Sequence, residues 1–266
     1  LHLTPTALYT LGLRGYAQRG VECVLGPLCP VPGGVFTMGS DKARDKDASD
    51  SETPQYPVQV GDFAIGQHPV TVAEYACAVR AKAVREPPEF LGVTWAKQLQ
   101  RRDHPVVCVS WNDATAYAAW LAKLTGQPWR LPTEAEWEKA ARGTDGRIYP
   151  WGNTWDKARA DTSDGGPKTT TPVGAYAARG DASPCGAHDL AGNVWEWTSS
   201  LFTPYPYNAT DGRERADTTG NRVLRGGSWY SYPRVARAAY RNGDGVPVLA
   251  NSAWGFRLAC LAAAGS

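Results

Sequence analysis

Glycine and proline are the residues that most constrain how this chain can fold. The sequence holds 28 glycines and 20 prolines among 266 residues, well above the roughly 12% of an average chain. Both residues are needed mainly where a backbone turns, so we expect a loop-rich fold with short helices and short strands. The chain also has 11 Trp and 12 Tyr but only 5 Phe. Buried Trp and Tyr require hydrogen-bond partners, and we expect them to pin loops to the core.

Length, hydropathy and charge exclude several classes of protein. A chain of 266 residues with 42% hydrophobic side chains can form one large domain or two small ones. Its apolar runs are shorter than the roughly 18 residues of a membrane-spanning helix, so no membrane span is expected. The net charge is only +2. Nucleic acid is therefore not an expected partner.

The cysteines and histidines do not follow a metal-binding pattern. The cysteines are Cys23, Cys29, Cys77, Cys108, Cys185 and Cys260, and the histidines are His2, His68, His104 and His188. No two cysteines form a C-x-x-C pair and the histidines are isolated along the chain, so neither zinc nor iron is expected. Proximity in the sequence favours Cys23 and Cys29 as a disulfide pair, although buried thiols are an equally open alternative.

The chain divides into an N-terminal segment and one main domain. Residues 1–34 are expected to form a short helix over Ala7–Arg19 and a connector rich in glycine and proline, and residues 35–261 the domain. Three capping boxes, each with Ser or Thr followed three residues later by Glu or Asp, predict helices that begin at Thr71, Ser110 and Thr133. Strands are expected near residues 35–39, 58–65, 222–224 and 255–261.

Eight short phrases occur in an order typical of one protein family. They are Gly33–Ser40, Pro69–Tyr75, Pro105–Trp111, Arg130–Glu138, Tyr149–Asn153, Gly192–Trp197, Arg225–Trp229 and Gly255–Arg257. In these phrases the chain resembles the formylglycine-generating enzyme (sulfatase-modifying factor) superfamily over residues 33–260. The resemblance implies an α+β architecture, a loop-rich elaboration of the C-type lectin fold with short helices and short antiparallel strands.

The residues at the family's catalytic positions do not fit its chemistry. Family enzymes oxidise a sulfatase cysteine with two copper-binding cysteines that lie two and seven residues after the Trp of the R-G-G-S-W phrase. Here these positions hold Ser231 and Ala236. A hydroxyl is a poor ligand for a soft metal and a methyl group is none, so we expect no copper site and no enzyme activity. The related sulfoxide-forming enzymes of ergothioneine synthesis use an iron-binding histidine set that we do not expect here either.

Residues 222–259 resemble the variable region of proteins diversified by retroelements. In that class a fixed frame alternates with positions encoded by AAC codons, which mutate at adenines and never yield Lys, Glu, Gln, Met or Trp. None of these five residues occurs from Tyr230 to Ala253. The resemblance therefore implies a non-enzymatic display protein, encoded for instance by a phage or prophage, with a diversified ligand-binding surface.

Twelve positions between the frame residues are the candidate ligand contacts. They are Tyr230, Ser231, Tyr232, Arg234, Val235, Tyr240, Asn242, Gly243, Asp244, Leu249, Asn251 and Ser252. Tyrosine and arginine suit protein or glycan ligands because they offer large contact area with a polar tip. A sulfatase-modifying oxidoreductase and a pseudo-enzyme with a fixed structural or regulatory partner remain alternatives. Localisation stays open, and a cell-surface, secreted or phage-associated protein is compatible with the sequence.

The resemblance also implies structural roles for other residues. A family calcium site would here use the carboxylates of Asp189 and Glu196 with the carbonyls of Gly192 and Val194, a hard oxygen set that suits calcium. A second family site would fall near Asp161, Thr162 and Asp164. Within the variable region, four frame arginines are expected to bind buried carboxylates or loop carbonyls. They are Arg225, Arg237, Arg241 and Arg257.

Overall fold

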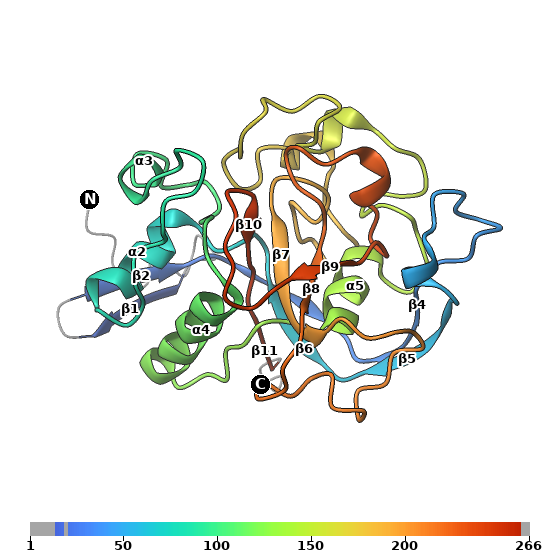
Figure 1. Cartoon of the computed structure of the whole chain (residues 1–266), viewed down its shortest axis with the longest axis horizontal. Helices are drawn as coiled ribbons and strands as arrows, with labels where there is room; N and C mark the ends of the chain where they lie inside the picture. The colour runs from blue at the N-terminus through green and yellow to red at the C-terminus, as the bar shows by residue number, and fades with distance from the viewer. Residues whose placement is uncertain (1–13, 19–20, 262–266) are drawn as a thin grey trace.

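The computed structural model describes residues 14–18 and 21–261 (Figure 1). It is a mixed α/β fold of short elements joined by long loops. The strands are β1 (Arg14–Gln18), β2 (Val21–Leu25), β3 (Leu28–Val31), β4 (Gly34–Met38), β5 (Tyr56–Val60), β6 (Phe63–Gly66), β7 (Trp195–Leu201), β8 (Arg222–Arg225), β9 (Asn242–Gly245), β10 (Trp254–Gly255) and β11 (Ala259–Leu261). The α-helices are α2 (Val72–Arg80), α3 (Trp95–Gln98), α4 (Trp111–Thr125) and α5 (Glu134–Arg142). Single 3-10 turns are η1 (Asp50–Glu52), η2 (Lys157–Arg159), η3 (Ala177–Arg179) and η4 (Pro233–Val235).

The three predicted helices form where the capping boxes place them. Each cap side chain accepts a hydrogen bond from the backbone N–H three residues later, and the acidic side chain there accepts one from the backbone N–H of the cap residue. Helix α4 ends at Gly126, which has φ 72°, and α5 ends at Gly143, which has φ 64°. Glycine adopts such left-handed angles without a steric penalty. The single turn α3 carries no capping box and was not predicted.

The strands of the described residues form four small sheets. The strand orders are β10-β7-β8-β9, β11-β6-β3, β4-β5 and β1-β2. All pairs are antiparallel except β10 with β7, which is parallel. The expected strand over residues 58–65 is two strands, β5 and β6, that belong to different sheets. The sheet that contains β8 and β9 carries the candidate ligand-binding region.

The N-terminal segment contributes a strand and buried side chains to the domain and does not act only as a connector. Strand β3 pairs with β6, and Cys23 and Leu25 of β2 are buried in the main hydrophobic cluster. Residues 14–18, expected in a helix, form a strand that pairs with β2 over its whole length. That part of the helix prediction is wrong because cross-strand pairing outweighs local helical spacing. Residues 7–13 and 19 of the expected helix lie outside the described residues.

The core consists of two main clusters of buried side chains. One lies between helices α2 and α4 and the end of the chain, where Tyr75, Tyr117 and Phe256 pack ring against ring. The other lies between α5 and strands β4 to β6, around Trp137. Four buried indoles donate hydrogen bonds, among them Trp197, whose Nε1 donates to the Val109 carbonyl at 3.0 Å. In the part of the chain that the structure describes, no helix has the length and apolar character to cross a membrane.

Candidate functional site

The candidate site begins where β8 ends. Gly226 and Gly227 follow the strand with φ 91° and 74°, and they turn the chain toward η4. A Cβ atom on Gly227 would lie 3.2 Å from the Cα of Ala236. The left-handed angle and the close backbone approach both require glycine here. The turn leads into the loop of residues 228–236, which contains η4.

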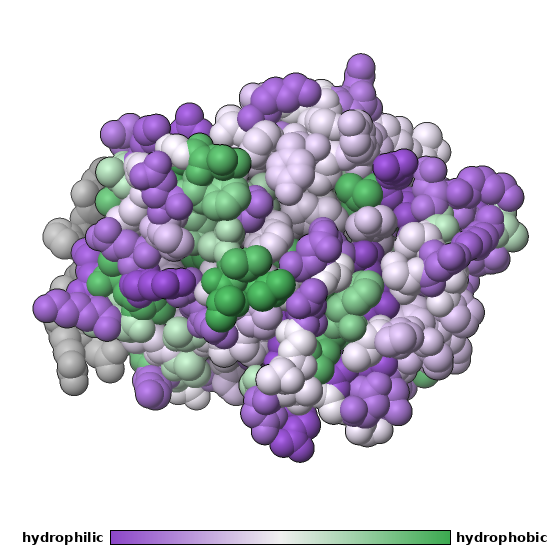
Figure 2. All heavy atoms as spheres, viewed as in Figure 1, coloured by the Kyte–Doolittle hydropathy of each residue, from purple (hydrophilic) through white to green (hydrophobic). Residues whose placement is uncertain are grey.

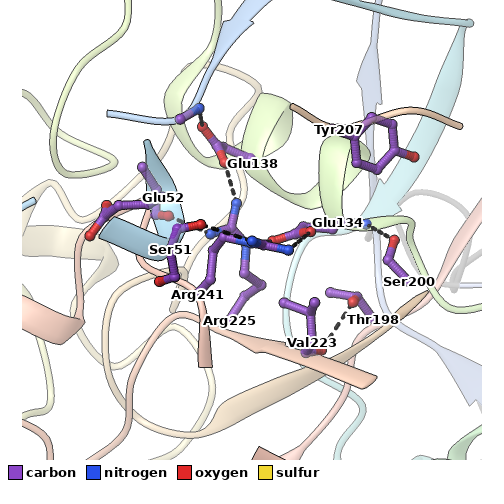
Figure 3. A network of polar contacts seen from close by, with 12 residues as sticks. Ser51, Glu52, Glu134, Glu138, Thr198, Ser200, Tyr207, Val223, Arg225 and Arg241 are labelled. Carbon is purple, nitrogen blue, oxygen red and sulfur yellow. Dashed lines mark hydrogen bonds and ion pairs between the residues drawn. The ribbon is translucent and has the colours of Figure 1, made fainter. Parts of the chain in front are cut away.

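Buried arginines anchor this loop to helix α5. Arg241 donates to both oxygens of Glu134 at 2.5 and 3.0 Å, and Arg225 forms an ion pair with Glu138 one turn later on the same helix. Figure 3 shows the two arginines lying between these glutamates and the segment that carries Ser51. Burial opposes the charge on Arg225, but Glu138 and Glu134 outweigh it and raise the pKa of the guanidinium. Both arginines are therefore charged braces rather than reactive groups.

Arg237 and Arg257 complete the set of braces. Arg237 donates to Asp45 at 2.6 Å and to Glu52 at 2.7 Å. Burial favours protonation of Glu52, but the hydrogen bonds and charge of Arg237 outweigh it and hold the pKa of Glu52 below its ordinary value. Arg257 donates to both oxygens of Glu196 at 2.6 and 2.7 Å. The expected bracing role of the four frame arginines is confirmed.

The most exposed candidate ligand contacts lie between these buried arginines in the sequence. Tyr232 is 66% exposed, Leu249 52% and Tyr230 46%, and Arg234 and Asp244 are also exposed. The Arg234 guanidinium lies 5.8 Å from the centre of the Tyr232 ring. Figure 2 shows hydrophobic side chains gathered on this face, in the area where Figure 1 draws the loop between β9 and β10. That loop carries the exposed Val248 and Leu249.

Six other candidate positions are only partly exposed. They are Val235, Tyr240, Asn242, Gly243, Asn251 and Ser252. Val235 and Tyr240 pack against the main hydrophobic cluster, and the Tyr240 ring lies 6.0 Å from that of Trp195. The side-chain oxygens of Asn242 and Asn251 accept backbone hydrogen bonds from residues two positions later. These side chains therefore stabilise the conformation of the loops as well as contributing to their surface.

Ser231 does not lie on the surface, which corrects the expectation for this position. It is 5% exposed, and its Oγ lies 3.0 Å from the Ser228 Oγ and accepts from the Ser228 backbone N–H at 3.0 Å. Its carbonyl accepts hydrogen bonds from the backbone and the side chain of Ser163. The tight turn after Gly227 points this side chain inward. Ala236 is also fully buried.

A cavity of about 450 Å³ opens beside the variable region. Its lining includes Trp229 and Ser252 as well as Lys97, Arg101 and His104. Arg101 donates to the Thr169 hydroxyl at 3.2 Å. No motif in residues 97–104 predicts this pocket, because the turn of α3 approaches the variable region only in the folded chain.

Asp189 of the first predicted calcium site and Asp161 of the second lie near each other. Asp161 is buried, and both of its carboxylate oxygens lack a hydrogen-bond partner. Burial and the nearby charge of Asp189 raise the pKa of Asp161 to about 7. Asp189 accepts from the Gly174 N–H at 2.7 Å, and its Oδ2 lies 3.7 Å from His68 Nδ1. The rings of His68 and His188 stack at 5.3 Å, so these two histidines, separate in the sequence, are neighbours in space.

The other predicted calcium ligands are placed differently. Glu196 has both oxygens engaged by Arg257, and Oε2 also accepts from Trp137 Nε1 at 2.6 Å. Gly192 pairs with Asp161 through a backbone bridge, and Val194 is buried. Asp161, rather than Glu196, therefore supplies the unsatisfied carboxylate beside Asp189. In the described part of the chain no three His, Cys, Asp or Glu side chains converge on a metal position, so backbone carbonyls would have to complete such a site.

Comparison with known proteins identifies relatives along almost the whole chain. The family model of the sulfatase-modifying factor enzyme 1-like domain matches residues 25–262. The formylglycine-generating enzyme of Streptomyces coelicolor is 35% identical over 86% of this chain and 87% of its own length. The hercynine oxygenase of Mycolicibacterium smegmatis is 34% identical over 83% of this chain, which spans only 58% of that protein. The inactive C-alpha-formylglycine-generating enzyme 2 of Bos taurus is 34% identical over 86% of both chains.

Two solved structures share the architecture. PvdO from Pseudomonas aeruginosa superimposes with a TM-score of 0.75 and 27% identity over 94% of this chain and 98% of its own. Variable protein 1 of Treponema denticola superimposes with a TM-score of 0.73 over 94% of this chain and 99% of its own. The second is 21% identical, so the likeness extends to the fold alone.

Proposed function

Because this chain belongs to the family of the sulfatase-modifying factor enzyme 1-like domain, we propose that it is a non-enzymatic member that binds ligands through its C-terminal region. Residues 222–259 are the variable region, and the domain has the C-type lectin architecture of formylglycine-generating enzymes. The ligand is a protein or a glycan that contacts the surface formed by Tyr230, Tyr232, Arg234, Asp244 and Leu249. A retroelement diversifies these positions.

The observation that carries this proposal is the contrast between side chains within one short loop. The two positions where family enzymes hold copper-binding cysteines carry Ser231 and Ala236, both buried. Neither supplies a thiolate, which is the soft ligand that a copper ion requires. Between and beside them, Tyr230, Tyr232 and Arg234 face solvent. The loop therefore lacks the family's redox groups and presents large polar-tipped side chains.

The geometry favours a surface that tolerates substitution. Tyr230, Tyr232, Arg234 and Asp244 each lie within five residues of an arginine whose buried side chain donates two or more hydrogen bonds. Arginines anchored in this way should preserve the backbone conformation when the exposed side chains are substituted, as rigid scaffolds do for binding loops. Tyrosine also gives a large contact area at a low entropic cost.

Sequencing related clones and the neighbouring genome tests the display function. We expect a reverse-transcriptase gene and a near-copy of the codons for residues 222–259, with clones that differ at the exposed positions and keep the frame arginines. Clones that are identical at Tyr230, Tyr232 and Leu249 would instead favour a pseudo-enzyme with a fixed partner.

The second candidate function is a sulfatase-modifying oxidoreductase, which the names of the relatives favour. It is tested with a cysteine-containing sulfatase peptide and Cu(I). We expect neither tight copper binding nor conversion of the peptide cysteine. A Ser231→Cys/Ala236→Cys double variant is the matched control, because it restores the two family thiols. Peptide oxidation by the unaltered chain would contradict the proposed function.

We also propose a structural calcium site at Asp161 and Asp189. The two unpartnered carboxylate oxygens of Asp161 and the adjacent Asp189 fit a hard divalent cation, which prefers oxygen ligands. Backbone carbonyls of the same loops would complete the coordination. The ion would offset the repulsion between the two carboxylates.

A further inference from the structure

Four of the six cysteines meet as two pairs that the sequence does not reveal. Cys23 on β2 and Cys77 on α2 are buried in the same hydrophobic cluster, and each thiol perturbs the pKa of the other. They are 54 positions apart in the sequence. The expected pair of Cys23 with Cys29 is not formed, since β2 and β3 direct these two side chains into different clusters.

The second pair joins β3 to a distant loop. Cys29 and Cys185, which lies 156 positions later in the chain, perturb each other's pKa, and a Cβ atom on the adjacent Gly186 would lie 3.8 Å from the Cys29 Sγ. Cys185 Sγ also lies 3.3 Å from the Ser183 hydroxyl and 3.5 Å from the Ala140 carbonyl of α5. Both residues belong to the cluster around Trp137. The two pairs thus connect consecutive N-terminal strands to separate parts of the body.

We propose that Cys23 with Cys77, and Cys29 with Cys185, form two disulfide bonds that fasten strands β2 and β3 to the domain. The oxidant is a disulfide, either of a thiol oxidoreductase or of oxidised glutathione. Such bonds persist in oxidising compartments, so the proposal also places the maturation of this chain there. It is independent of the ligand-binding surface, which contains no cysteine.

One thiol of each pair has a pKa below the ordinary value of a cysteine. The hydrogen bond from Cys23, together with the guanidinium of Arg80 at 3.2 Å from Sγ, lowers the pKa of Cys77 to about 7. The hydrogen bonds from Cys29 and Ser183 lower the pKa of Cys185 to about 6. The thiolate is the attacking species in disulfide exchange. In each pair the thiol with the lowered pKa is the one that forms the attacking thiolate more readily.

The chemistry balances in two exchange steps. The Cys77 thiolate attacks the disulfide of the oxidant, forms a mixed disulfide and releases one thiolate of the oxidant. Cys23 then loses its proton, attacks the Cys77 sulfur and releases the second thiolate. Two protein thiols are oxidised by two electrons and one oxidant disulfide is reduced to two thiols. Cys185 and Cys29 react in the same order. Because three of the four thiols are buried and Cys185 is half-buried, exchange occurs during folding or local opening.

Peptide mapping of the full chain tests the proposal. The protein is refolded in a mixture of reduced and oxidised glutathione, alkylated and digested without reduction. We expect one linked peptide that contains Cys23 and Cys77 and another that contains Cys29 and Cys185. Four alkylatable cysteines at these positions, or a link between Cys23 and Cys29, would overturn the proposal.

Single substitutions separate the two bonds. Cys77→Ser is expected to abolish the first link and keep the second, and Cys185→Ser the reverse. Cys108→Ser is the matched control, since it removes a buried thiol that belongs to neither pair, and both links should persist. If a variant does not fold, unfolding of the oxidised wild type with and without dithiothreitol remains decisive. Reduction should lower the melting temperature by about 10 °C, from the usual worth of two such bonds, and an unchanged value would count against them.

Discussion

At the scale of single residues, the variable region depends on arginines whose charge is compensated by distant carboxylates. Arg237 is buried and bonded to Asp45 and Glu52, whereas Arg234, three residues earlier, is exposed. The same residue type thus braces the loop at one position and faces solvent at the other. Removing a partner from a buried ion pair leaves an uncompensated charge in a region of low polarity.

Arg237→Ala should therefore be strongly destabilising. We expect the free energy of unfolding to fall by about 3–5 kcal/mol, the usual cost of breaking a buried pair. Arg234→Ala is the control and should change stability by about 0.5 kcal/mol or less. Urea unfolding of both variants measures the difference. Equal effects would mean that the bonds of Arg237 do not hold the loop.

Glu52 should make stability sensitive to acid. Its pKa in the folded protein lies below the ordinary value of 4.5, so its contribution is complete above pH 4.5 and is lost as the pH falls through the folded-state pKa. In that acidic window, Glu52→Gln should make the unfolding free energy depend less steeply on pH. Near neutrality, the slope of this dependence should be unchanged. An unchanged acidic slope in the variant would show that other carboxylates control it.

At the scale of elements, the segment after β8 exposes two of its tyrosines to solvent and packs the third against the core. Tyr230 and Tyr232 are exposed, and Tyr240 packs on Trp195 and the main cluster. This division follows from the turn at Gly226 and Gly227, and from the anchoring of Arg241 directly after Tyr240. Diversification at Tyr240 would therefore affect packing as well as the surface.

The tyrosines should respond differently to replacement. Tyr230→Ser together with Tyr232→Ser should shift the melting temperature by no more than a few degrees, because exposed substitutions change stability by under about 0.5 kcal/mol each. Tyr240→Ser should lower it clearly further, since it removes a partly buried ring from the cluster. Calorimetry of the two variants makes the comparison. A large loss in the double variant would place those rings in the core.

At the scale of the whole molecule, the fold is held together by links between segments that are far apart in the sequence. Glu134 and Glu138 of α5 bind arginines that follow them by about a hundred residues. The loop at Asp161 pairs with that at Gly192, which in turn donates to the Gly226 carbonyl. A cation at Asp161 and Asp189 would strengthen the same connection to the variable region.

Calcium should therefore raise the melting temperature of the whole domain. We expect an increase at about 1 mM calcium, in the range of extracellular sites, and its reversal by a chelator. Asp161→Asn should abolish the increase. Asp164→Asn should retain it, since Asp164 accepts a hydrogen bond from Trp155 and lacks the unpartnered burial of Asp161. A wild-type protein that is indifferent to calcium would contradict the site.

Local features were accessible from the sequence alone. The three capped helices depend on hydrogen bonds between residues three positions apart, so Thr71, Ser110 and Thr133 located them correctly. The glycine and proline content indicated a loop-rich architecture, and the ordered phrases indicated the family. The absence of thiols at residues 231 and 236 is also a property of the sequence.

Only the tertiary structure decided which partners meet. It turned Ser231 inward, left Asp161 rather than Glu196 as the unsatisfied carboxylate near Asp189, and buried Cys23 in the same cluster as Cys77 rather than with Cys29. It also showed residues 14–18 as a strand. Each of these outcomes depends on side chains or strands from distant parts of the chain. These side chains become buried, and their charges become compensated, only after the segments pack together. The spacing of residues along the sequence therefore does not predict these contacts.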